Sequence, residues 1–132
     1  MKFWNELEGS TFFNKAFSKS IPIDSIELLS VIIDNNRPSI TIEFDIPELP
    51  DKAPEKWKKS GFNKCRIGIH CGNIFNLEIK NIPTQEKLSI TIENSESTYF
   101  TRISNNESLI AFSTKYISLC GPSVHTNSGD KN

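Results

Sequence analysis

Hydrophobic and polar residues alternate along much of the chain, and the alternation begins near residue 26. Between residues 40 and 46, isoleucine and phenylalanine alternate with polar residues, which is typical of a strand with one buried face. Residues 26–34 have apolar residues at both odd and even positions, which predicts a central or doubly covered strand. The intervening Asn-Asn-Arg-Pro at residues 35–38 has turn composition, so the two segments predict a hairpin.

The same alternation returns in later stretches, at residues 62–71, 75–80, 88–93, 99–104 and 109–114, with a further candidate strand at 116–120. Gly72-Asn73 predicts a tight hairpin turn between the first two of them. The connections after residue 61 are short, and short connections join antiparallel neighbours. The pattern therefore predicts an α+β, mainly β protein, an antiparallel meander of seven to eight strands.

The N-terminal segment has a different pattern, which predicts short helical pieces at residues 3–7 and 10–17. Ser10 is a candidate helix N-cap, and Phe13 and Phe17 stand four residues apart, with Phe12 adding to the same stripe. We interpret this segment as a short helical cap that covers the core of the sheet. A helix that binds a partner is the alternative.

The length of 132 residues predicts one globular domain, which we place at residues 1–121. Residues 122–132 are polar and predict a flexible tail. Residues 47–61 interrupt the strands with three prolines within eight residues, which excludes a central strand there. A loop of this length inside a compact domain is often functional.

The amino-acid composition favours strands, and it limits the cellular compartments and the classes of partner that we expect. Eighteen isoleucines stand against three alanines, which favours strands over helices. The net charge of −1 gives no electrostatic footprint for nucleic acid or an anionic membrane, and the apolar runs are too short to span a bilayer. Glu6 and Glu8 interrupt any apolar signal segment, so we expect a cytoplasmic protein.

The sequence offers no positive case for catalysis, a metal or a cofactor. No nucleophile elbow, phosphate-binding loop or metalloprotease helix is present. The three cysteines form no zinc-type spacing with the two histidines, and they predict buried free thiols rather than a metal site or disulfide framework. We therefore expect that the protein is not an enzyme.

Charge is sorted along the chain in a way that the near-neutral total hides. Residues 24–55 carry a net charge of −6, and residues 56–66 carry +5. The two blocks meet in the proline-rich loop beside Trp57, and a tryptophan beside sorted charge is typical of a protein–protein contact. The alternatives are that Trp57 folds back over the sheet and that the charges are solvated or pair with each other.

Several of these segments, in this order, resemble immunity protein family fifty of bacterial polymorphic-toxin systems. They are an early tryptophan (Trp4), IELLS at residues 26–30, ITIEF at 40–44, PEKW at 54–57, CRIGI at 65–69 and LEI at 77–79. The resemblance covers residues 4–120. It implies a mainly β cytosolic protein, without catalytic residues, that binds and neutralises a cognate toxin.

The charge and aromatic pattern, rather than the resemblance, supplies the candidate contacts with this toxin. The candidate toxin-binding residues are Glu43, Asp45, Glu48, Asp51, Trp57 and Lys58. The alternative function is that of a small-molecule-binding β module, which requires a large apolar cavity under the helical cap. The oligomeric state stays open.

Overall fold

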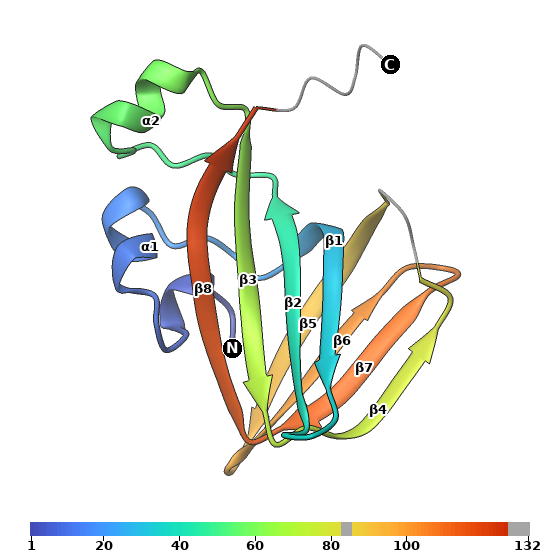
Figure 1. Cartoon of the computed structure of the whole chain (residues 1–132). Coiled ribbons are helices and arrows are strands. Elements are labelled where there is room, and N and C mark those ends of the chain that lie inside the picture. Colours follow the sequence, from blue (N-terminus) through green and yellow to red (C-terminus); the bar gives the residue numbers. More distant parts are fainter. Residues whose placement is uncertain (83–85, 127–132) are drawn as a thin grey trace.

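The architecture is mainly β, as the alternation predicts, and the computed structural model describes residues 1–82 and 86–126 (Figure 1). Three short helical segments in this part of the chain are η1 (Trp4–Glu6), α1 (Thr11–Ala16) and α2 (Glu55–Ser60). The strands described are β1 (Ser25–Asp34), β2 (Ser39–Ile46), β3 (Lys64–Gly72), β4 (Phe75–Lys80), β5 (Lys87–Ser95), β6 (Thr98–Ser104), β7 (Leu109–Thr114) and β8 (Tyr116–His125).

All strand pairs are antiparallel, and the spatial order is β4-β7-β6-β5-β1-β2-β3-β8. Consecutive strands pair from β1 to β3 and from β5 to β7, as in a meander. The hairpin predicted at Gly72-Asn73 is wrong, because β3 pairs with β8 and β4 pairs with β7. Asn73 has a φ of 53° and redirects the chain. The apolar alternation of β8 matches the buried face of β3, whereas every residue of β4 is exposed.

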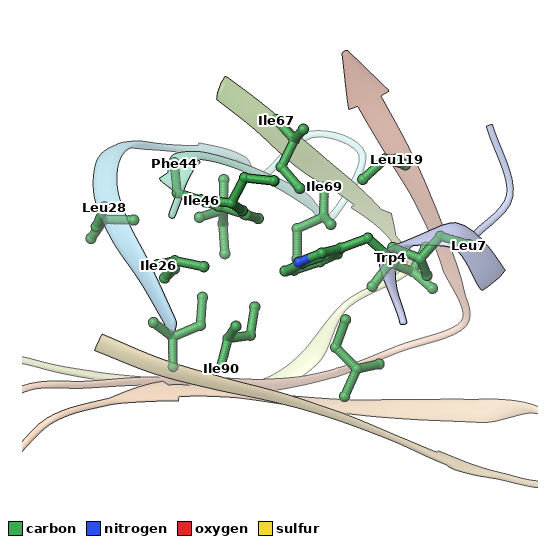
Figure 2. Close-up of a cluster of buried hydrophobic side chains, with 14 of the residues drawn as sticks. Trp4, Leu7, Ile26, Leu28, Phe44, Ile46, Ile67, Ile69, Ile90 and Leu119 are labelled. Atoms are coloured by element: carbon green, nitrogen blue, oxygen red, sulfur yellow. The ribbon is translucent and has the colours of Figure 1, made fainter. Parts of the chain in front are cut away.

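The sheet folds over on itself and encloses the core. β1 pairs with β2 over most of its length but with β5 only at Ser25–Glu27, so the two halves of the sheet diverge beyond that junction. In Figure 1, β5 passes behind β1 and β2. Figure 2 shows side chains of both halves facing each other, among them Ile69 of β3 and Ile90 of β5. The core is therefore the space between the two halves.

The predicted helical cap is confirmed, and it closes this core with aromatic side chains. Trp4 of η1 is fully buried, and its ring centroid lies 5.3 Å from that of Phe44 on β2 (Figure 2). Phe13 and Phe17 are buried with their ring centroids 4.6 Å apart. Phe12 does not join this stripe, because it lies on another face of α1 and stays 41% exposed.

Ser10 occupies the N-cap position of α1, but its hydroxyl does not cap the helix. The hydroxyl instead donates a hydrogen bond of 2.9 Å to the carbonyl oxygen of Asn5. The side chain therefore ties α1 to η1, and the two helical pieces are held together over the core.

β1 lies in the interior of the sheet, as predicted, but it is not covered on both faces. Leu29 and Ile32 are 43% and 61% exposed. In Figure 1, the described helices α1 and α2 lie to the left of β8, and neither covers the face of β1 and β2 that is turned toward the viewer. The apolar residues of β1 therefore predicted more burial than the structure shows.

The predicted boundary at residue 121 falls inside β8. Residues 122–125 continue the strand, with Ser123 opposite Arg66 and His125 opposite Lys64, because β3 extends far enough to pair with them. Residues 122–125 therefore belong to the sheet rather than to a flexible tail. Residues 127–132 of the predicted tail lie outside the described residues.

Candidate functional site

The face of β1, β2, β3 and β8 that points away from the core presents rows of side chains, and we call it the outer sheet face. The register places one residue of each strand in a row. The first row is Glu27, Asp45, Arg66 and Ser123, and the next is Ser30, Glu43, Gly68 and Cys120. Glu43 and Asp45 thus share one face, as the alternation predicts, but their surroundings differ.

Asp45 is engaged inside the molecule. It is 6% exposed, and the Nε atom of Arg66 donates a hydrogen bond of 3.0 Å to its Oδ1 atom. The Nη2 atom of Arg66 lies 3.5 Å from Oδ2, so the guanidinium contacts both carboxylate oxygens. This carboxylate is therefore occupied by β3 and stabilises the pairing of β2 with β3.

Glu43 is exposed and lies beside a shallow hollow of about 150 Å³. Gly68 lines this hollow, and a Cβ atom there would lie only 2.9 Å from the carbonyl oxygen of Ile42, so a larger residue would require the strands to shift. Ile32 and Cys120 form part of its rim. Burial, and then the charge of Glu43, raise the pKa of the Cys120 thiol. This shift disfavours the thiolate form of Cys120, although the residue itself is exposed.

Asp51 ties the proline-rich loop to the N-terminal cap. Its carboxylate accepts hydrogen bonds from the hydroxyl of Ser18 and, at 2.9 Å, from the backbone N–H of Ser18. These hydrogen bonds lower the pKa of Asp51. Next to it, the backbone N–H of Lys52 donates a hydrogen bond of 2.9 Å to the carbonyl oxygen of Ala16. The loop is therefore fixed against α1.

Glu48 lies in the same loop and is half-buried. Its Oε1 atom is buried and makes no hydrogen bond to any described residue. Burial, and to a smaller extent the charge of Asp24, raise the pKa of this carboxyl group above its usual value of 4.5. The folded state thus disfavours the ionised form of Glu48.

This unfavourable carboxylate gives a prediction for stability. We expect Glu48→Gln to raise the free energy of unfolding at pH 7, by less than about 1 kcal/mol because the group is partly solvated. The pKa of Glu48 is higher in the folded state than in the unfolded state, so the folded wild type is favoured when Glu48 is protonated. This contribution to stability is complete below pH 4.5 and is lost as the pH rises through the folded pKa.

The measurement is urea unfolding of wild type and variant at pH 7 and near pH 4, with Glu93→Gln at an exposed position of β5 as the control. The gain from Glu48→Gln should shrink at the lower pH. An equal gain at both pH values would contradict the burial of an ionised Glu48.

The proline-rich loop contains α2, which the alternation did not predict. α2 begins after Pro54 and ends at Gly61, whose φ of 67° is the left-handed conformation common after helices. Trp57 is half-buried, and its ring packs edge-on against Phe12 of α1, with centroids 5.4 Å apart. Trp57 therefore covers α1 rather than the sheet and keeps part of its ring at the surface.

Lys58 lies next to Trp57 on α2 and pairs with Glu55 at 3.5 Å. Both side chains are more than half exposed, and such pairs stabilise a helix only weakly. The ammonium group of Lys58 therefore stays available to a partner.

With the geometry described, comparison with known proteins decides the family. The family model Immunity protein 50 matches residues 9–125. The chain belongs to this family. The match begins after Trp4 and ends at the last residue of β8, so it runs further toward the C-terminus than the resemblance over residues 4–120. No curated protein and no solved structure matches the chain significantly.

Membership of the immunity protein 50 family confirms the family inferred from the sequence and implies neutralisation of a cognate toxin. Immunity proteins typically act without catalysis. Among the described residues, no group of three histidine, cysteine or acidic side chains is placed to hold a metal ion. His70 and Cys71 point to opposite faces of β3, the first exposed and the second fully buried. No described helix has the length and apolar character needed to cross a membrane.

The six candidate residues of this immunity protein 50 family member lie in three places rather than in one site. Glu43 and Asp45 lie on the outer sheet face, whereas Trp57 and Lys58 lie on α2, which contacts α1. Glu48 and Asp51 belong to the loop between these regions and are engaged with the rest of the fold. Sequence reasoning missed Phe12 as the partner of Trp57. Phe12 directly precedes Phe13 and so lies on a different face of the helix, which was the one indication in the sequence that Phe12 packs elsewhere.

The small-molecule alternative receives little support from the surface. Three hollows measure about 150, 180 and 130 Å³. Pockets for small ligands usually measure about 300–1,000 Å³. Beneath the cap, the space that such a ligand requires holds the buried rings of Trp4, Phe13 and Phe17.

Proposed function

We propose that this protein neutralises its cognate toxin in the cytoplasm by binding it and occluding its functional surface. Membership of the immunity protein 50 family supports a toxin as the partner. The observation that carries the binding mechanism is the Phe12–Trp57 pair, which holds a partly exposed tryptophan in place on α2. Fixed aromatic side chains at a surface are the residues that most often dominate the energy of protein–protein contacts.

Among the six candidates, we propose Glu43, Trp57 and Lys58 as direct toxin contacts, because their side chains reach the surface. Asp45 is buried, and the exposed Asp51 is engaged by Ser18, so both carboxylates act in intramolecular contacts instead. Asp45 holds β2 against β3 through Arg66, and Asp51 holds the loop that carries α2 against α1. Glu48 belongs to the same loop, and its substitution should change stability more than toxin affinity.

Co-expression with the cognate toxin tests the proposal. Wild type should restore growth and co-purify with the toxin. Trp57→Ala should weaken toxin binding at least about tenfold, because it removes the anchoring ring. Phe12→Ala should have a similar effect, since it leaves Trp57 without its support.

Tyr116→Ala is the matched control, because Tyr116 is an aromatic residue that is 66% exposed on the outer sheet face, away from α2. Its effect on toxin affinity should stay within about twofold. Melting temperatures of all variants check that they remain folded. The proposal is wrong if toxicity persists with wild type present and no complex forms. The assignment of Trp57 is wrong if its substitution matches Tyr116→Ala.

A further inference from the structure

Positive charge is concentrated at one end of the molecule, which we call the helical end and define as residues 10–20 and 51–60. It carries six lysines and two carboxylates, a net charge of +4, in a chain whose total is −1. The lysines are Lys15, Lys19, Lys52, Lys56, Lys58 and Lys59. The rest of the chain therefore carries a net charge of −5, and the protein is strongly dipolar.

The two segments of the helical end are held side by side. Phe12 contacts Trp57, Ser18 donates to Asp51, and the N–H of Lys52 donates to Ala16. In Figure 1, α1 lies beside the middle of β8 and α2 lies above α1, near the C-terminal end of that strand. The two segments that carry the lysines are thus held together around a partly exposed aromatic pair.

The carboxylates of this surface are already occupied, whereas most of its lysines are not. Asp51 is bound by Ser18, and Glu55 pairs with Lys58. The other five lysines are exposed, and none of them forms an ion pair with a described residue. Neighbouring positive charges repel one another, so a partner that supplies carboxylates lowers the electrostatic repulsion at this surface.

We propose that the helical end docks on an acidic protein surface of the cognate toxin, with Trp57 at the centre and the lysines around it. This inference rests on the proposed function and names the chemistry of its partner. It places the lysines of the helical end, rather than the acidic candidates Asp45 and Asp51, around Trp57, because these two carboxylates are already bound within the molecule.

An acidic protein fits this surface better than a nucleic acid does. A nucleic acid carries a long, continuous line of phosphates, and the helical end is a small part of a chain whose remainder has a net charge of −5. The remainder repels any polyanion that extends beyond the helical end. A carboxylate patch limited to the size of the helical end avoids this repulsion.

The test combines three substitutions, Lys52→Gln, Lys56→Gln and Lys59→Gln, in one variant of the full chain. Its association rate constant with the purified toxin domain is measured at about 50 mM and about 500 mM salt. The wild-type rate should fall steeply with salt. At low salt the variant should associate at least about tenfold more slowly, and its rate should depend less on salt.

The matched control neutralises three exposed lysines elsewhere on the sheet, with Lys80→Gln, Lys87→Gln and Lys115→Gln. This variant should change the rate less than about twofold. Equal rates for the two triple variants, with the complex intact, would overturn the docking surface while leaving toxin binding established. Loss of duplex DNA binding in the helical-end variant, with unchanged toxin binding, would assign the surface to nucleic acid instead. Failure of wild type to bind the toxin at all would overturn the proposed function itself.

Discussion

Trp4→Ala should lower the free energy of unfolding by about 3–5 kcal/mol. Trp4 has no exposed surface and packs against Phe44, between the two halves of the sheet (Figure 2). Its removal leaves a cavity that cannot collapse easily, because its surroundings belong to two sheet halves fixed by their own backbone pairing. The change should be visible as a lower urea midpoint with an unchanged slope.

Trp4→Phe separates the packing of the ring from its polar atom. The Nε1 atom of Trp4 is buried and makes no hydrogen bond to a described residue, so phenylalanine loses volume but no hydrogen bond. We expect a cost of about 1–2 kcal/mol, well below that of alanine. Equal costs for both variants would show that the indole N–H, rather than the packing of the ring, stabilises this core.

Asp45→Ala should lower the free energy of unfolding by about 2–3 kcal/mol. The substitution leaves Arg66 without the carboxylate that accepts its two hydrogen bonds, next to a strand pairing that both residues support. Breaking a fully buried ion pair from one side costs about 3–5 kcal/mol. The value here is lower because the side chain of Arg66 is 27% exposed and regains some water.

Chemical denaturation of the single variants and of the double variant D45L/R66M tests this interpretation. The double variant replaces both partners with apolar groups and should unfold within about 1 kcal/mol of wild type. Arg66→Met alone should be less stable than the double variant, because it strands a buried carboxylate. Additive losses in the double variant would show that Asp45 and Arg66 act independently.

The sequence predicted those features of the fold that depend on local alternation. The pattern from Ile40 to Ile46 and that from Cys65 to Cys71 correctly place one face of β2 and one of β3 in the core. The hairpin predicted from Gly72-Asn73 was wrong because turn residues indicate where the chain reverses, not which strand the next segment pairs with. Only the apolar face of β8, more than forty residues away, explains why β3 does not pair with β4.

The candidate site shows the same division between local and non-local information. Glu43 and Asp45 share a strand and a face, yet one is exposed and the other buried, because Arg66 lies opposite Asp45 and Gly68 lies opposite Glu43. Neither of these cross-strand pairings can be predicted from the local sequence. The charge blocks that meet at residues 55 and 56 are visible in the sequence, but the contact that engages Asp51 with Ser18 is not.

In the proposed mechanism, this protein binds and occludes the toxin rather than altering it chemically. The most direct test is a titration of the purified toxin's activity with the purified chain, together with measurement of the complex. Activity should fall linearly and vanish near one equivalent of chain, with a stable complex from which active toxin is recovered on dissociation. Loss of toxin activity at far less than one equivalent, or without a complex, would contradict the account.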